Sequence, residues 1–268
     1  MKYVNINLYQ YKLIKKDVDY MLNKNEILQI ATTQLSLDYN FNINDLTSKN
    51  NIIVENTLLD GRRIYDNDGC FLKILCFNGK AFISADPKIL PWCKEKLLTT
   101  DAAWLSEYPK LKAIDNKLKE FGHEIADIHH YYLPKITHTD IKSQFSIKWY
   151  EKDDIYQFQN DNRFGEAFAF DKNHPDVLAV AAFDGDTMLG MAGASADSDT
   201  MCQLGIDVFP EYRGKGIATT LVTLLKNEVL NRGKVPFYGT VETHFNSQNV
   251  AINSGFFPAW AELYTKIL

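Results

Sequence analysis

Hydrophobic residues in the first half of the chain recur at helical spacing in two segments, with a strand-like segment between them. Segment 26–35 carries apolar residues roughly on one helical face, and segment 111–121 carries a second stripe that Gly122 is placed to end. Segment 71–84 predicts a β-hairpin, because Asn78-Gly79 suits a type I′ turn, in which both central residues have positive φ. This half therefore predicts a mixture of helices and strands.

The second half has a different pattern, in which strands dominate. In chain order it predicts strand 145–150, helix 151–160, strands 177–183, 187–195 and 201–209, helix 217–231, strand 237–242, helix 247–254 and strand 260–265. Asp184-Gly185-Asp186 joins the second and third of these strands as a hairpin turn. The order β-α-β-β-β-α-β-α-β predicts an α/β (α+β) fold.

A polar run over 135–142, which follows Pro134, is the expected linker between the two halves. It divides the chain into a smaller α+β accessory domain, residues 1–138, and a second domain, residues 139–268. His129 and His130 precede the linker. Adjacent residues of an extended chain point to opposite faces, so the pair makes a poor metal chelate and packing between the domains is expected.

The composition narrows the classes of function. The 268 residues include 46% hydrophobic and 24% charged residues and carry a net charge of −5, as is usual for a soluble globular protein. The sequence contains no basic stripe, no metal-ligand spacing of its four cysteines and no apolar run of about 18 residues. We expect a cytoplasmic protein with reduced thiols that binds neither nucleic acid, membrane nor metal.

The segment EYRGKGIATT, residues 211–220, joins a predicted strand to a predicted helix through two glycines and two cations. Free N–H groups and the dipole at a helix start favour anions, and glycine lets a phosphate approach the backbone. A tight turn with solvated cations is the plain alternative. The sequence does not match the P-loop motif, because Lys215 is followed by Gly216 where that motif has serine or threonine. It does not match the dinucleotide-binding motif G-x-G-x-x-G/A either, because Thr219 stands where that motif has its last glycine or alanine.

The sequence R213-G-K-G-I-A218 has the R-x-x-G-x-A form, and over about residues 145–268 the chain resembles the GNAT superfamily of acyl-CoA-dependent N-acyltransferases. The resemblance rests on this turn, the strand before it, Pro210, the following amphipathic helix and the late segment S247-Q-N-V-A-I-N-S-G-F256. It implies a mixed central sheet flanked by helices and acetyl-CoA as acyl donor. The residues that it implies for acetyl-CoA binding are Asp207, Val208, Arg213, Gly214, Lys215, Gly216, Ile217, Ala218, Thr219, Asn246, Ser247 and Asn249.

The chain departs from the family pattern at a position that matters for the chemistry. Many members carry a tyrosine that protonates the departing thiolate, in an L-Y-x-x-x-G-F pattern, but here Ala251 occupies that position. The proton donor could be Tyr264 or Tyr238, the thiolate could leave unassisted, or the activity could be lost. The family's upstream asparagine aligns with His244.

The reaction also requires a base, because an alkylammonium with a pKa of about 10.4 must lose a proton before it attacks. The candidates are Asp207, Glu166 and Glu242, each of which can equally be a solvated or capping carboxylate. Cys202 could carry an acyl group in a ping-pong route, but a lone thiol on a strand usually packs in the core.

Two functions follow from the resemblance. The first is an N-acetyltransferase that transfers acetyl from acetyl-CoA to a primary amine of a small molecule or peptide by direct attack, acting as a monomer or homodimer. The alternative, motivated by Ala251, is a non-catalytic acyl-CoA-binding sensor or interaction protein. Residues 1–138 contain no second R-x-x-G-x-G/A turn, so one CoA site per chain is expected and a degenerate GNAT-like copy is one interpretation of this half.

Overall fold

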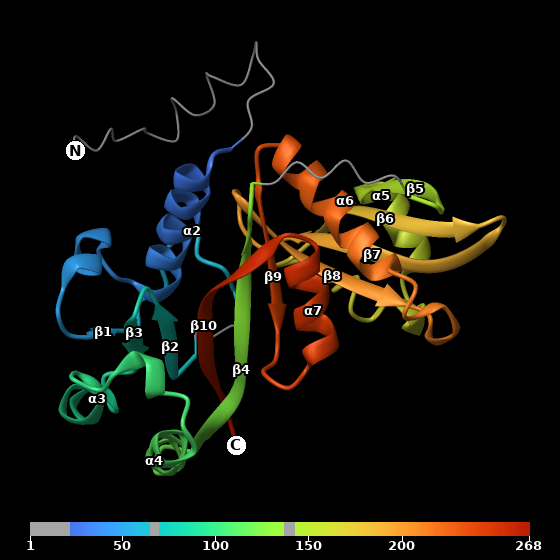
Figure 1. Ribbon diagram of the computed structural model, residues 1–268. Coiled ribbons are helices and arrows are strands. Elements are labelled where there is room, and N and C mark those ends of the chain that lie inside the picture. The colour runs from blue at the N-terminus through green and yellow to red at the C-terminus, as the bar shows by residue number, and fades with distance from the viewer. Residues whose placement is uncertain (1–21, 65–69, 137–142) are drawn as a thin grey trace.

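Strands from both halves of the chain join in one mixed β-sheet (Figure 1). The computed structural model describes residues 22–64, 70–136 and 143–268. The sheet has the strand order β1-β3-β2-β10-β4-β9-β8-β7-β6-β5. Its strands are β1 (Ile52–Glu55), β2 (Leu72–Phe77), β3 (Lys80–Ala85), β4 (His123–Pro134), β5 (Ser146–Glu151), β6 (Asp176–Asp184), β7 (Thr187–Ala196), β8 (Met201–Val208), β9 (Val235–Thr240) and β10 (Phe256–Ile267).

The helices cover both faces of this sheet (Figure 1). They are α2 (Lys24–Tyr39), α3 (Leu90–Leu97), α4 (Tyr108–Lys119), α5 (Lys152–Ile155), α6 (Ile217–Asn231) and α7 (Phe245–Asn253). Helix α6 buries Leu221 and Leu225 against Leu204 of β8 and Tyr238 of β9. Helix α2 packs against the opposite face of β9, in a core that includes Phe237. Thus β9 lies between α6 on one face of the sheet and α2 on the other.

The central strands interleave the two ends of the chain. Strand β10 lies between β2 and β4 and pairs antiparallel with both, while β4 pairs antiparallel with β9. Strand β8 pairs antiparallel with β7 and parallel with β9. The expected domain boundary after residue 138 lies outside the described residues and stays a prediction, but hydrogen-bonded strand pairs join the segments on its two sides.

Most of the predicted elements are confirmed. The segment 26–35 lies within α2, and the order of elements in the second half is the predicted one. Asn78 and Gly79 have φ values of 51° and 75°, as the type I′ turn requires. Helix α4 ends at Lys119, and Gly122, with φ 74°, donates its N–H to the Lys119 carbonyl and completes the final turn.

One expectation about the elements was wrong, and one strand was not predicted. Residues 127–133, for which no element was predicted, lie in strand β4, where His130, Tyr131 and Tyr132 pair with β9. The helix expected over 151–160 is shorter, since α5 is followed by a 3₁₀ turn, Tyr156–Phe158, and by Asn160 in a left-handed conformation with φ 72°.

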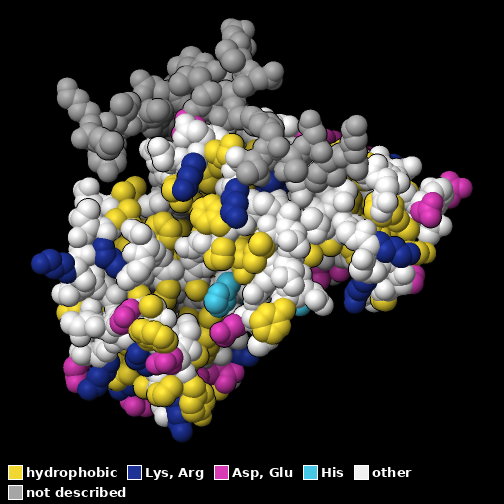
Figure 2. All heavy atoms as spheres, viewed as in Figure 1, with side chains coloured by type: hydrophobic (Ala, Val, Ile, Leu, Met, Phe, Trp, Pro, Cys, Tyr) yellow, Lys and Arg dark blue, Asp and Glu magenta, His cyan; other side chains and the backbone are white. Residues whose placement is uncertain are grey.

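The surface and the helices of the described part of the chain have three further features. Figure 2 shows positively and negatively charged side chains dispersed over the visible face, without a large area of one sign. Among the described residues, no helix is long and apolar enough to cross a membrane. The same residues contain no group of three or more His, Cys, Asp or Glu side chains arranged to hold a metal ion.

Candidate active site

A cavity of about 850 Å³ opens where β8 and β9 separate. The parallel pairing of these strands ends at Leu204 and Tyr238, whereas β8 continues along β7 as far as Val208, which pairs with Gly190. Within the described residues, the edge of β8 over 205–208 therefore faces the cavity without a neighbouring strand. Its backbone N–H and C=O groups are available to an extended ligand, as the unpaired edge of any sheet is.

The turn between β8 and α6 forms one end of the cavity. Gly214 and Gly216 have φ values of 79° and 77°, a region that favours glycine, and no atom lies within 4 Å of where a Cβ would project. Gly216 is the N-cap of α6, without a side-chain cap, and its carbonyl accepts the first helical bond from the Thr220 N–H at 3.0 Å. The preceding N–H groups of α6 thus form an anion-binding helix start beside open space.

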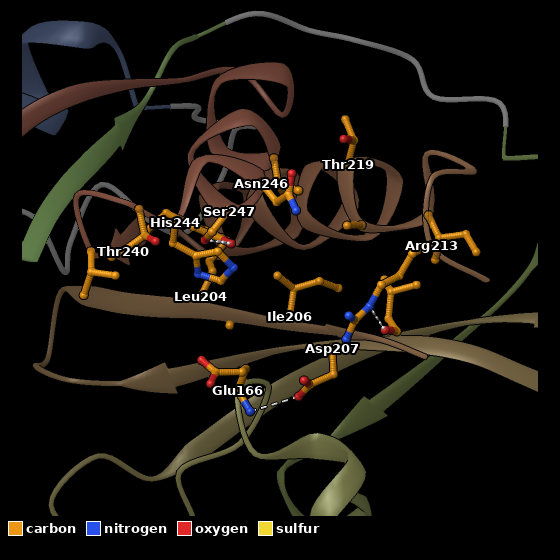
Figure 3. Close-up of a pocket in the computed structure, with 18 of the residues that line it drawn as sticks. Glu166, Leu204, Ile206, Asp207, Arg213, Thr219, Thr240, His244, Asn246 and Ser247 are labelled. Carbon is orange, nitrogen blue, oxygen red and sulfur yellow. Dashed lines mark hydrogen bonds between the residues drawn. The ribbon is translucent and has the colours of Figure 1, made fainter. Parts of the chain in front are cut away.

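Arg213 fixes this turn to the end of β8. Its Nε donates to the Val208 carbonyl at 3.0 Å (Figure 3). The other cation of the turn, Lys215, lies with Nζ 5.4 Å from the centre of the Tyr212 ring and outside the cavity lining. The guanidinium therefore adds positive charge beside the helix start, while the ammonium lies on the outer side of the turn.

The structure brings together most of the residues expected to bind the acyl donor. Asn246 and Ser247 of α7 lie across the cavity from the β8 edge, and Arg213 lies at the far end (Figure 3). Of the expected set, Lys215 and Asn249 do not line the cavity. Those that line it are Asp207, Val208, Arg213, Gly214, Gly216, Ile217, Ala218, Thr219, Asn246 and Ser247.

Asp207, expected as a base candidate, lines the cavity but is engaged in holding a neighbouring loop. Its Oδ2 accepts the N–H groups of Glu166 and Ala167, each at 2.9 Å (Figure 3). Burial raises the pKa of Asp207, while these two hydrogen bonds and the nearby Arg213 charge act in the opposite direction. The carboxylate is thus an acceptor for backbone donors.

The loop that carries Glu166 lies directly on the sheet. Gly193 and Gly205 are cross-strand partners, and a Cβ on them would overlap the carbonyl oxygens of Ala167 and Glu166 respectively. Figure 3 shows Glu166 on the other side of β8 from Ser247 and Asn246. Because Glu166 also lines the cavity, the cavity reaches both faces of the sheet through the gap between β8 and β9.

The two candidate tyrosines occupy different places. The Tyr238 hydroxyl lies 2.9 Å from Ser247 Oγ at the cavity wall, and burial raises the pKa of Tyr238 while that hydrogen bond lowers it. Tyr264, on β10, does not line the cavity, and burial raises the pKa of Tyr264 to about 12. Ala251 is fully buried one helical turn after Ser247.

The remaining candidates lie apart from the cavity. Glu242 is exposed and is not part of the lining. Cys202 is buried in the core between the sheet and α6, and burial raises the pKa of its thiol to about 11. A buried thiol in this form is a poor nucleophile.

The cavity also contains residues that were not expected in the site, chiefly His129, Gln203, Thr240 and His244. His129 was expected to pack between domains. The signal that could have placed it is the alternation Asp127, His129, Tyr131, which puts these side chains on one face once the segment is recognised as a strand.

A mixed α/β sheet that opens between two parallel central strands, beside a glycine-rich helix start, defines the class of protein as GNAT-like in fold. Residues 136–256 match the model of the family described as Acetyltransferase (GNAT) family, and this part of the chain is a GNAT acetyltransferase domain. No curated protein sequence gives a significant match to the chain.

The chain is similar to several solved structures, each at low sequence identity. A GCN5-related N-acetyltransferase-like protein from Streptococcus suis is 14% identical, with 90% of this chain and 98% of that chain covered and a TM-score of 0.46. A GNAT-family acetyltransferase from Colwellia psychrerythraea is 11% identical, with 93% and 99% covered and a TM-score of 0.45. YncA of Salmonella typhimurium, solved with its cofactor acetyl-CoA, is 15% identical, with 47% and 95% covered and a TM-score of 0.33.

Proposed function

We propose that the chain is an acetyl-CoA-dependent N-acetyltransferase that transfers acetyl to a primary amine of a small molecule or peptide by direct attack. The observation that carries this proposal is the glycine-rich start of α6, with Gly214 and Gly216 in left-handed conformations over open space, beside the unpaired edge of β8. The membership of residues 136–256 in the GNAT family, whose members use acyl-CoA, supports the same donor.

The residues at the donor side suit coenzyme A in two respects. The N–H groups at the start of α6 would bind the pyrophosphate, with Arg213 adding charge. The open edge of β8 over 205–208 would pair with the amide groups of the pantetheine arm and present an N–H to the oxyanion of the tetrahedral intermediate. When bound, acetyl-CoA supplies an activated acetyl thioester.

Tyr238 is the proton donor that the geometry favours for the departing thiolate. It lies in the cavity wall, its phenol is protonated at neutral pH because the ordinary pKa of tyrosine is about 10, and its hydroxyl contacts Ser247 on α7. Ser247 precedes Ala251 by one helical turn on α7. The hydroxyl from β9 would thus serve where α7 carries no tyrosine at position 251.

Calorimetric titration with acetyl-CoA tests the donor. We expect binding with a Kd below hundreds of micromolar, and Gly216→Glu should abolish it by placing a carboxylate in the phosphate site. Gly185→Glu is the matched control, since Gly185 also has positive φ (56°) and open space at its Cβ but lies in the β6–β7 hairpin. Absence of acetyl-CoA binding by the unaltered protein would overturn the proposal. An equal loss of affinity in both variants would show that the effect of Gly216→Glu is not specific to the turn before α6.

A second candidate function, a non-catalytic acyl-CoA sensor, is favoured by Ala251 at the position of the family's tyrosine. Thiol release from acetyl-CoA in the presence of ethanolamine, spermidine, kanamycin or a lysine-containing tripeptide separates the two functions. Turnover above the buffer rate with any of these amines excludes the pure sensor. Tight binding without turnover on the whole panel would favour it.

A further inference from the structure

The side of the cavity opposite α6 and α7 is built partly by the first half of the chain. A Cβ on Gly239 of β9 would lie 2.8 Å from Tyr131 Cε1 and 3.5 Å from Gln203 Nε2, so Tyr131 and Gln203 meet over this glycine. Alternation along β8 puts Gln203 on the same face as Gly205, on which the Glu166 loop rests. Tyr131 and the cavity-lining His129, two residues apart on β4, therefore share the face of the Glu166 loop.

The orientation of the His129 ring is restricted on several sides. It lies parallel to the Tyr264 ring, at 6.4 Å between centres and 4° between planes, and 6.1 Å from the Tyr131 ring. Its Nδ1 lies 3.5 Å from Asp127 Oδ1, is shielded from solvent and has no hydrogen-bond partner among the described residues. The side chain as a whole is 25% exposed and lines the cavity, so its accessible part is other than Nδ1, as a base that uses Nε2 requires.

Among the neighbouring carboxylates of the described residues, Asp127 is the one placed to pair with Nδ1, at ion-pair distance and not at the distance of a formed hydrogen bond. Glu262 stands opposite His129 in the β4–β10 register, but its Oε1 already accepts Arg63 Nη2 at 2.6 Å and Trp260 Nε1 at 2.7 Å. Asp127 Oδ1 accepts the Ile128 N–H at 2.7 Å, which fixes this oxygen near the ring. If the 3.5 Å approach between Nδ1 and Asp127 Oδ1 closes to a hydrogen bond, the carboxylate holds the hydrogen on Nδ1 and leaves a free lone pair on Nε2.

We propose that His129 is the base that accepts the proton of the acceptor amine, and that Asp127 is its positioning residue. This inference rests on the proposed acetyltransferase function and deepens it. The carboxylate base candidates fit this role less well, because Asp207 Oδ2 is engaged with two backbone N–H groups and Glu166 is exposed on a loop. Glu166 instead supplies negative charge on the same face, which selects an acceptor that arrives as a primary ammonium.

The proton and electron balance is simple. The ammonium gives one proton to His129 Nε2, and the nitrogen lone pair forms the N–C bond to the acetyl carbonyl. The C–S bond then breaks with its electron pair on sulfur, and the thiolate takes a proton from Tyr238, which recovers one from the acylated nitrogen through solvent. His129 returns its proton to solvent, so one ammonium and one thioester give an amide, a thiol and one proton.

The tautomer of His129 can be measured without any acceptor. We expect two-bond ¹H–¹⁵N spectra of histidine-labelled protein to show the Nδ1–H form for the resonances that are lost in His129→Gln. Asp127→Asn should shift those resonances toward the Nε2–H form, whereas His130→Gln, a change on the other face of β4, should leave them in place. An Nε2–H tautomer of His129 in the unaltered protein overturns the inference.

Turnover supplies the second measurement, with the amine from the thiol-release panel that reacts fastest. We expect His129→Gln to lower kcat by about 10²-fold or more while the Kd of acetyl-CoA stays within about twofold, and His130→Gln to retain activity. Free imidazole should restore part of the activity of His129→Ala. Unchanged kcat in His129→Gln overturns the inference and leaves the proposed function intact. Failure of the unaltered protein to bind acetyl-CoA overturns the proposed function itself.

Discussion

Gly193 of β7 and Gly205 of β8 lie directly opposite each other, and together they form a flat strip on which the loop carrying Glu166 rests. The carbonyl oxygens of Ala167 and Glu166 occupy the space that side chains at these two positions would fill. The position of Glu166 at the cavity therefore depends on the absence of two methyl groups in the sheet beneath it.

Gly205→Ala should lift this loop from the sheet. The new methyl group would meet the backbone of Glu166, which cannot yield as the end of a flexible side chain could, so we expect a loss of roughly 1–3 kcal/mol in the free energy of unfolding. The same displacement should raise the KM of the acceptor amine more than the Kd of acetyl-CoA. Chemical denaturation and steady-state kinetics measure the two effects.

Gly165→Ala is the matched control for that change. Gly165 lies in the same loop, has a φ of −67°, and has no atom within 4 Å of where its Cβ would project. We expect this variant to stay within about 0.5 kcal/mol of the parent. Equal destabilisation by the two substitutions would show that the loop is sensitive to any added methyl group and would contradict the packing argument.

Asp207→Ala should destabilise the same loop by removing the carboxylate that accepts two of its backbone N–H groups. The change leaves the N–H groups of Glu166 and Ala167 without their carboxylate acceptor, and we expect a cost of about 2–3 kcal/mol in the free energy of unfolding. Asp186→Ala, in the exposed β6–β7 turn, is the control. A loss of turnover in Asp207→Ala without any loss of stability would instead favour Asp207 as the base.

The sequence was sufficient for the glycine-rich turn because that turn is built from contiguous residues. The spacing of Gly214 and Gly216 between a strand and an amphipathic helix predicts the turn, and the structure adds that both glycines have positive φ. The order of helices and strands along the second half follows from hydrophobic periodicity and turn residues. These features depend on short segments of the chain, so hydrophobic periodicity and turn residues within each segment are enough to predict them.

The acceptor side could not be predicted in the same way, because it is assembled from distant segments. His129 reaches the cavity only because β4 pairs with β9 about 110 residues later in the chain, and Glu166 because its loop crosses two strand glycines. Strand β4 was not predicted because residues 123–134 mix apolar and polar side chains without a regular alternation. The choice between Tyr238 and Tyr264 likewise depended on which strand borders the cavity.

Tyr238→Phe tests the proton donor. Removal of the hydroxyl leaves the ring in place, so we expect the Kd of acetyl-CoA to stay within about twofold while kcat falls by about 10- to 100-fold. Tyr264→Phe is the matched control, since Tyr264 does not line the cavity. Thiol-release kinetics with the fastest amine of the panel measure both variants. A larger loss in Tyr264→Phe would reverse the assignment of the two tyrosines.

Burial of Lys226 should make the free energy of unfolding rise with pH in the alkaline range. Its side chain is fully buried in α6, with Nζ donating to the Ser254 carbonyl at 2.8 Å, and burial lowers the pKa of Lys226 from 10.5 to about 8. Between these values the unfolded chain binds more protons than the folded one, so this residue makes the free energy of unfolding rise with pH from about 8 to 10. Urea denaturation across that range should show a rise in the parent that is absent in Lys226→Met and kept in Lys172→Met, an exposed control. Parallel pH profiles of the parent and Lys226→Met would contradict the prediction.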